Sequence, residues 1–260
     1  MHLFLAPHPD DAPLSCGGTI YQLREAEEQT CVILTIMSGD PPEPLPDSAL
    51  VRELHERWEA GTNPMIARRQ EDEEAATVLS AKSIIHTSML DCIYRTAPDG
   101  TPLYPVGSAI NGNVHPHDGA LPSLLVVDLP YADQVTHVYA PLGVGHHVDH
   151  QIIRDWALHL AAKHPEITFL FYEDYPYAER PQATEQALGY FEVELQPEIK
   201  LLRDVDVLIK LVALQHYPSQ ISTFWGSIQE MEDRVRTFMQ RTGEMIETGS
   251  PVERYWRVVR

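Results

Sequence analysis

The 260-residue sequence has few basic residues, few cysteines and no long apolar run, and each shortage excludes a class of protein. It holds 19 Lys and Arg against 38 Asp and Glu, a formal net charge of −19. We therefore expect no nucleic acid partner, because nucleic acids bind to basic surfaces. We expect no integral membrane segment, because no apolar stretch has the length to cross a bilayer. The N-terminus lacks the basic and apolar regions of a signal peptide, which favours the cytoplasm.

The three cysteines, Cys16, Cys31 and Cys92, are scattered and lack the paired spacing of zinc ligands. This pattern indicates reduced and mostly buried thiols. The hydrophobic fraction of 43% is ordinary for a globular protein, and the length is ample for a core. With no repeat, low-complexity tract or clear linker, we expect one domain over residues 1–260.

Strand-like apolar runs alternate with helical patterns along the chain. The expected strands are residues 2–6, 31–37, 83–87, 136–140 and 167–172. The expected helices cover residues 17–28, 64–80, about 148–160 and about 205–212. Such alternation predicts the α/β class, here a Rossmann-like, three-layer arrangement with helices on both faces of a mostly parallel sheet. Residues 95–123, rich in Pro, Gly and Asn, are expected to form a long irregular segment, either a functional lid or a mobile loop.

The sequence His8-Pro9-Asp10-Asp11 follows the first expected strand directly. His8 and Asp11 offer an imidazole nitrogen and a carboxylate oxygen to a metal, while Asp10 points differently and stays free. The same residues are also typical of a turn that caps a helix start. This motif alone does not decide between a metal site and a turn.

A second histidine cluster, His147-Val148-Asp149-His150, starts the helix after the strand at 136–140. One of its histidines could complete a set of two histidines and one carboxylate, which leaves metal positions open for water and substrate. An exposed polar helix start is the alternative. Ligands of parallel sheets bind beyond the carboxyl ends of the strands, where both clusters lie, so together they favour a metal site and hydrolytic chemistry.

Four segments resemble the PIG-L (LmbE-like) family of zinc-dependent de-N-acetylases, which remove acetyl groups from N-acetylglucosamine conjugates. The resemblance covers roughly residues 2–225, and the two histidine motifs are its specific part. The segments are Ala6-Pro7-His8-Pro9-Asp10-Asp11 with Gly17-Gly18-Thr19, Arg68-Arg69-Gln70-Glu71-Asp72, His147-Val148-Asp149-His150 and Tyr217-Pro218-Ser219-Gln220.

The resemblance implies a role for each residue of the two histidine motifs. The implied zinc ligands are His8, Asp11 and His150. Asp10 would be the general base, and His147, oriented by Asp149, would steady the oxyanion. The same ligand set accepts iron, cobalt or manganese. The implied partner is a small-molecule N-acetylated sugar conjugate. The protein could also form a homo-oligomer.

Three further residues are candidates for substrate binding, and each has a structural alternative. Arg68 could bind a sugar hydroxyl or phosphate, or lie on a solvated helix face. Asp40 and Asp91 follow expected strands, but each could equally form a turn. The cluster His115-Pro116-His117-Asp118 is interpreted as part of a mobile loop in preference to a second metal site.

One residue departs from the family's pattern: Ala12 stands where a Glu usually follows the two aspartates. Two other functions remain open on the sequence alone. One is a metal-dependent hydrolase of another amide or ester, and the other is a non-catalytic metal- or sugar-binding protein of the same fold. The presence of Asp10 favours catalysis, because a binding protein has no need of a base. The full G-x-G-x-x-G pattern is absent, which argues against a nicotinamide cofactor.

Overall fold

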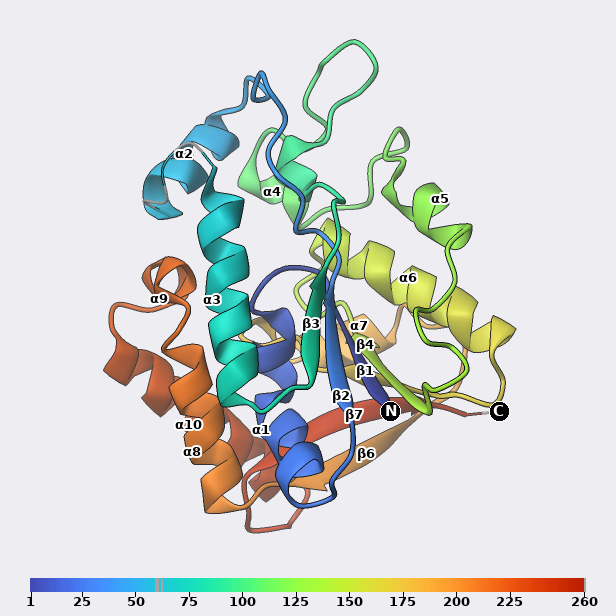
Figure 1. Ribbon diagram of the computed structural model, residues 1–260, viewed down its shortest axis with the longest axis vertical. Helices are drawn as coiled ribbons and strands as arrows, with labels where there is room; N and C mark the ends of the chain where they lie inside the picture. The colour runs from blue at the N-terminus through green and yellow to red at the C-terminus, as the bar shows by residue number, and fades with distance from the viewer. Residues whose placement is uncertain (59–60, 62, 260) are drawn as a thin grey trace.

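A seven-stranded sheet forms the centre of the protein in the computed structural model, which describes residues 1–58, 61 and 63–259 (Figure 1). The strand order is β3-β2-β1-β4-β5-β7-β6. The first five strands in this order are parallel, while β7 runs antiparallel to both β5 and β6. The strands are β1 (His2–Ala6), β2 (Cys31–Thr35), β3 (Ser83–His86), β4 (His137–Pro141), β5 (Thr168–Tyr172), β6 (Leu195–Leu201) and β7 (Val252–Val258).

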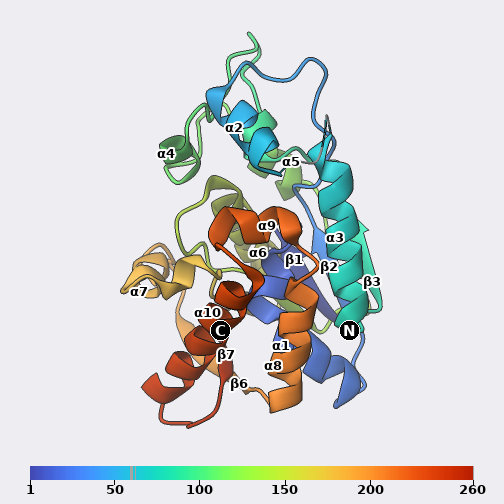
Figure 2. The ribbon, with the colours of Figure 1, turned by 90° about the vertical axis from the view of Figure 1, so that its left-hand side faces the viewer.

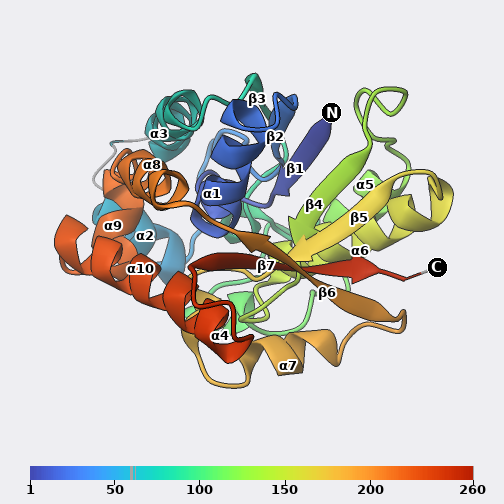
Figure 3. The same ribbon diagram turned by 90° about the horizontal axis from the view of Figure 1, so that it is seen from below.

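Helices cover both faces of this sheet (Figure 3). One face carries α1 (Asp11–Glu25), α3 (Pro64–Val78), α8 (Asp204–Leu214) and α10 (Ile228–Met245), and the other carries α5 (Ala120–Leu125), α6 (Val148–Lys163) and α7 (Ala183–Leu188). Successive side chains of β1 point to opposite faces of the sheet. Phe4 packs in the core beneath α1, α3, α8 and α10, whereas Leu3 and Leu5 pack in the core beneath α5, α6 and α7. The predicted α/β, three-layer architecture is confirmed.

The parallel strands point their carboxyl ends toward a smaller layer, at the top of Figures 1 and 2. This layer contains α2 (Ala49–Trp58), α4 (Gly107–Ile110) and the short helix η1 (Cys92–Tyr94), around a third apolar cluster that includes Trp58 and Tyr94. The other short elements are η2 (Tyr177–Glu179), directly after β5, and α9 (Pro218–Phe224). Residues 95–123 are mostly irregular, as expected, apart from α4, the start of α5 and one bridge between Thr96 and Pro102.

The glycine pair Gly17-Gly18 does not open a helix, contrary to our expectation. Helix α1 begins at Asp11, directly after the first histidine motif, and the pair lies in its middle. A Cβ atom on Gly18 would lie 2.7 Å from Cδ1 of Leu202, and one on Gly17 would lie 3.0 Å from Cγ of Lys210. The glycines therefore allow α8 and the chain before it to pack closely against α1.

The C-terminal part of the sheet was not predicted, since β6 and β7 were missed, and the helix α10 was missed as well. The three cysteines are free and buried, as expected. Within the residues that the structure describes, no helix combines the length and apolar character needed to span a membrane.

Candidate active site

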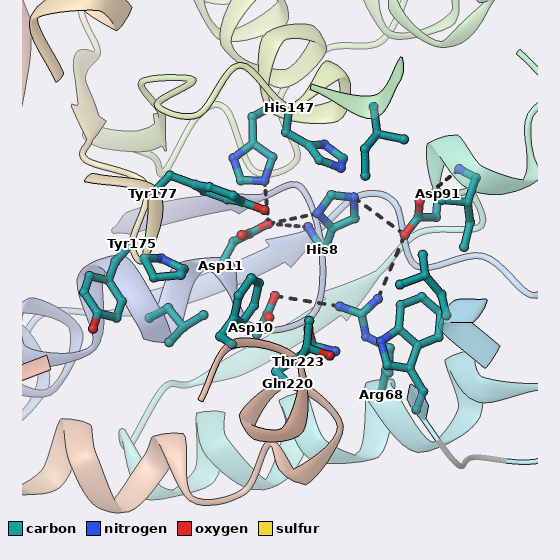
Figure 4. Close-up of a pocket in the computed structure, with 18 of the residues that line it drawn as sticks. His8, Asp10, Asp11, Arg68, Asp91, His147, Tyr175, Tyr177, Gln220 and Thr223 are labelled. Atoms are coloured by element: carbon teal, nitrogen blue, oxygen red, sulfur yellow. Dashed lines mark hydrogen bonds and ion pairs between the residues drawn. The ribbon is translucent and has the colours of Figure 1, made fainter. Parts of the chain in front are cut away.

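A pocket lies at the carboxyl end of the parallel strands, and four connections from these strands bring polar side chains into it (Figure 4). The chain after β1 supplies His8, Asp10 and Asp11, and the segment after β3 supplies Asp91. The start of α6, after β4, adds His147 and His150. Helices α3 and α9 and the segment after β5 close the sides with Arg68, Thr223, Gln220, Tyr175 and Tyr177.

Three buried side chains at the floor of the pocket suit a divalent metal. The Oδ2 atom of Asp11 lies 3.3 Å from Nδ1 of His8 and 3.4 Å from Nε2 of His150. Ligand atoms of a tetrahedral ion with bonds of about 2.0–2.1 Å lie about 3.3 Å apart, so both separations match. Among the described residues, three other groups have ligand atoms that all lie within 4.8 Å of one another: His8 with His147 and His150, Cys92 with His147 and Asp149, and His8 with Asp91 and Asp149. An alternative set of three histidines therefore occupies the same place.

Each of the two histidines beside Asp11 is bonded through its other nitrogen to a buried carboxylate. Nε2 of His8 lies 2.9 Å from Oδ2 of Asp149, and Nδ1 of His150 lies 2.6 Å from Oδ1 of Asp174. Such carboxylate–histidine pairs fix the tautomer and the ring orientation, which leaves the opposite nitrogen free to bind a metal. The donor set therefore fits a metal both in chemistry and in its surroundings.

We expected Asp149 to orient His147; its carboxylate is bonded to His8, and it is the backbone N–H of Asp149 that bonds to His147. The reason is the start of α6, where His147 is the N-cap residue and its Nδ1 accepts the backbone N–H of Asp149 at 3.3 Å. Sequence reasoning missed Asp174, although a signal was present. Asp174 follows the end of β5 closely, just as His8 follows β1.

Adjacent carboxyl groups in the first motif have opposite properties. Burial, together with the charge of Asp11, raises the pKa of Asp10 well above its usual value. Burial would also raise the pKa of Asp11, but His150 and His8 hold it below the usual range. The backbone of Asp10 has a φ of 115°, an unfavourable value for a residue with a side chain. The strained turn places a carboxyl group of raised pKa next to one of lowered pKa.

His147 presents a neutral imidazole to the pocket. Burial, reinforced by the nearby His8 and His150, lowers its pKa well below the ordinary value. Because Nδ1 accepts a backbone hydrogen bond, we assign the proton of the neutral ring to Nε2. Its Nε2 lies 3.9 Å from Sγ of Cys92 and can also donate a hydrogen bond to a group in the pocket.

Arg68 is buried in the pocket wall and does not lie on a solvated helix face. Its side chain is only 4% exposed, and Nη2 donates to the backbone oxygen of Pro9 at 3.1 Å. The guanidinium lies 3.8 Å from Asp10 and 3.9 Å from Asp91, and it covers the ring of Trp58. Arg68 and Asp91 are thus brought together where a substrate would lie.

Asp40 does not join them. It is exposed, and its Oδ1 accepts hydrogen bonds from Arg69 and Asn63 at 2.8 and 2.9 Å. Asp40 is not among the pocket-lining residues in the described part of the chain. Asp40 follows β2 at the carboxyl edge of the sheet, as expected. The chain has turned away from the pocket before it reaches this residue.

The two remaining segments of the family resemblance contact each other. The carboxylate of Glu71 accepts hydrogen bonds from the backbone and side chain of Ser219, and Asp72 accepts one from the hydroxyl of Tyr217 at 2.6 Å. These contacts fix α9 against α3, which holds Gln220 at the pocket. Their role is therefore to position the pocket wall.

Ala12 is fully buried in the apolar core under α1, so no polar group reaches the site from this position. The segment from His115 to Asp118 forms no candidate metal group among the described residues. Its Asp118 instead bonds to Arg95 and Tyr104. Sequence reasoning also missed the apolar wall of the pocket, which includes Leu54, Trp58, Ile110, Tyr177 and Phe224.

The model of the PIG-L family, described as GlcNAc-PI de-N-acetylase, matches residues 3–161, more than half of the sequence. The chain belongs to this family. It shares 27% identity over 247 residues with the 2'-N-acetylparomamine deacetylase of Niallia circulans, a match that covers 90% of this chain and 84% of that one.

Solved structures of PIG-L-like enzymes have the same fold. The zinc-inhibited form of teicoplanin deacetylase superposes with a TM-score of 0.81 at 25% identity, covering 100% of this chain and 98% of that one. The N,N'-diacetylchitobiose deacetylase of Pyrococcus horikoshii gives a TM-score of 0.56 at 20% identity, covering 99% and 83%, and is similar in fold. Family and relatives together identify this member as a hydrolase of linear amide C–N bonds.

Proposed function

We propose that the protein is a zinc-dependent de-N-acetylase that removes the acetyl group from an N-acetylated amino sugar in a small-molecule conjugate. One observation carries this proposal: Asp10, with its raised pKa, lies beside the buried donors His8, Asp11 and His150 in a pocket open to a ligand. The Niallia circulans relative, named for an acetylated amino sugar, supports the substrate class.

His8, Asp11 and His150 would hold the metal. When bound, the ion supplies Lewis acidity toward the amide carbonyl and lowers the pKa of water. Zinc is the first choice for two imidazoles and one carboxylate, and iron, cobalt or manganese would bind to the same set. Asp149 and Asp174 would hold the two histidine rings in place through the bonds described above.

Asp10 would act as the general base. A carboxyl group with a raised pKa takes a proton from the attacking water more readily than an ordinary one. It can then pass this proton to the nitrogen of the departing amine. The charge of Arg68, 3.8 Å away, balances the carboxylate before the first transfer and after the second.

His147 would bind the oxygen that becomes negative during attack on the acetamide. A neutral imidazole N–H at the pocket wall would stabilise such an oxyanion without first giving up a charge. Arg68 and Asp91 would bind sugar hydroxyl groups as donor and acceptor. Asp40 has no part in this proposal, because it lies outside the pocket.

The proposal treats residues 1–260 as one deacetylase domain, since β7, near the C-terminus, pairs with β5 in the same sheet as β1. We also place the protein in the cytoplasm. Three free and buried cysteines are typical of proteins from a reducing compartment. Cell fractionation with an antibody to the protein tests this location.

The function is tested by measuring bound metal and amine release from N-acetylglucosamine conjugates for the wild type and Asp10→Asn. We expect the wild type to bind about one zinc and to release amine. The variant should keep its metal and lose about 10²- to 10⁴-fold in rate, the usual contribution of a general base. Full activity in the variant would contradict the mechanism. Release from other amides or esters alone would favour the wider hydrolase alternative, and metal binding without any hydrolysis would favour a binding protein.

A further inference from the structure

Arg95 lies just after η1, at the start of the irregular segment 95–123, and bridges two buried carboxylates. Its Nη2 lies 2.5 Å from Oδ1 of Asp149 and 2.9 Å from Oδ2 of Asp118, and its Nε donates to Asp118 at 3.0 Å. A third nitrogen, Nη1, donates to the backbone oxygen of Leu90 at 2.9 Å. The guanidinium is thus fixed on three sides.

The burial of this cluster makes the bridge necessary. The side chains of Asp149 and Asp118 are fully buried, and that of Arg95 is 10% exposed. Two carboxylates so far from water require a cation and hydrogen-bond donors close by. The planar fork of an arginine meets both carboxylates at once, which a lysine ammonium cannot reproduce in the same geometry.

The two oxygens of Asp149 have separate partners. Oδ1 is bonded to Arg95, while Oδ2 accepts from Nε2 of His8 at 2.9 Å and from the backbone N–H of Cys92 at 3.0 Å. Arg95 therefore restrains the rotation of the carboxylate, and this orientation turns Nδ1 of His8 toward Asp11.

We propose that Arg95 is a positioning residue of the metal centre, acting through Asp149 on His8. The inference rests on the metal site proposed above. It also gives the segment 95–123 a role. The hydroxyl of Tyr104 donates to Asp118 at 2.7 Å and accepts the backbone N–H of His115 at 2.9 Å. The segment is therefore tied to the metal centre through the same arginine.

The first test compares the zinc affinity of the wild type, Arg95→Gln and Arg95→Lys by competition with a chelator of known affinity. Loss of a partner next to a ligand weakens binding by about 10- to 100-fold, so we expect about 10-fold for Arg95→Gln. Arg95→Lys keeps the charge but not the fork and should lose about 3-fold. The matched control is Arg52→Gln, which removes an exposed ion pair with Asp47 and should leave the affinity unchanged.

The second test is a double-mutant cycle with Asp149→Asn, again with zinc affinity as the readout. If Arg95 acts through Asp149, its substitution has little further effect once Asp149 is changed. A merely structural role would give additive losses in the two backgrounds. Thermal unfolding of the metal-free variants shows which of them are folded, and Arg95→Lys carries the test if Arg95→Gln does not fold.

These outcomes separate the inference from the function on which it rests. A wild-type protein that binds no divalent metal would overturn the metal site and the role of Arg95 together. A wild type that binds zinc, with folded Arg95 variants of equal affinity, would overturn only the role of Arg95. Additive losses in the cycle would do the same.

Discussion

Helix α1 borders two clusters of buried charge that differ in one respect. At its N-terminal end lie the pocket residues, and beside its middle lies the ion pair of Lys210 and Glu253. Glu253 has four partners, with Lys210 and the backbone of Gly18 on one oxygen and Thr19 and Tyr255 on the other. Within the described residues, no hydrogen bond reaches the carboxylate of Asp10. Arg68, 3.8 Å away, is its nearest cation.

The number of hydrogen bonds to the carboxylate distinguishes the Lys210–Glu253 pair, which we interpret as structural, from the pocket residues, which we interpret as functional. A carboxylate has about four acceptor sites, and the protein fills all of those of Glu253. Such a closed cluster has no capacity left for a ligand. Asp10 is buried to a similar extent, but its acceptor sites are left for a group outside the chain. A buried carboxylate without hydrogen-bond donors costs stability, and such groups are found at active sites.

The largest effect is expected from Asp11→Ala, which removes a carboxylate from the cluster of pocket residues. The variant removes the carboxylate between His8 and His150, so zinc affinity should fall by more than about 100-fold, beyond the loss seen for an outer partner. Amine release should fall with it, while the far-ultraviolet circular dichroism stays native. Bound zinc is measured by atomic emission after dialysis. Retention of one zinc per chain would show that the three-histidine set holds the metal.

The closed cluster is broken by Glu253→Gln, which leaves Lys210 buried without its counter-charge. We expect the free energy of unfolding to fall by about 3–5 kcal/mol, with zinc content per folded molecule unchanged. Urea denaturation followed by fluorescence measures the loss. The control is Glu198→Gln, which removes the exposed pair with Arg257 on the neighbouring strand and should cost less than about 1 kcal/mol. Equal losses in both variants would remove the distinction between the clusters.

Asp174→Asn tests whether the outer carboxylates belong to the functional cluster. Asp174 holds Nδ1 of His150, so the variant should bind zinc about 10- to 100-fold more weakly. Asp155→Asn is the matched control, because Asp155 pairs with Arg154 on α6 and is outside the pocket. Chelator competition measures both affinities. An unchanged affinity for Asp174→Asn would assign this residue to the fold instead.

The smallest effect at neutral pH is expected at the opposite end of β1. Burial, followed by the nearby His137, lowers the pKa of His2 to about 3 from its usual 6.5. The unfolded chain therefore takes up a proton near pH 6.5 that the folded chain refuses until about pH 3. The contribution of His2 is present above pH 6.5 and is lost as the pH falls through this window.

Replacement of His2 by Phe removes this proton uptake. The free energy of unfolding should then fall less steeply between pH 6.5 and pH 4 than in the wild type, as measured by urea denaturation at several pH values. Identical slopes in the two proteins would show that His2 is protonated as readily in the folded chain as in the unfolded one.

Much of the site could be predicted from sequence because its parts are local. His8 and Asp11 belong to one short motif after an apolar strand, and His150 belongs to another. The rule that parallel strands end at one edge brings the two together. The same alternation of apolar runs predicted the parallel part of the sheet.

The missed features depend on contacts between distant segments. His8, one of the partners of the Asp149 carboxylate, is 141 residues away in the sequence. Asp174 and Arg95 also acquire their roles only when β5 and the segment after η1 meet the pocket. Strand β7 lies beside β5 because of packing between distant segments, and the local sequence pattern does not predict this position. The glycine pair shows the same limit, since its need for space comes from Leu202 and Lys210.

The proposed function requires that this pocket hydrolyses an N-acetyl amide with a metal held by His8, Asp11 and His150. It is tested most directly by removing the metal with a chelator and following amine release from an N-acetylglucosamine conjugate while zinc is returned. We expect the activity of the wild type to disappear when the metal is removed and to return at about one equivalent of zinc. In Asp11→Ala the activity should not return. Amine release that continues unchanged in the metal-free protein would contradict it.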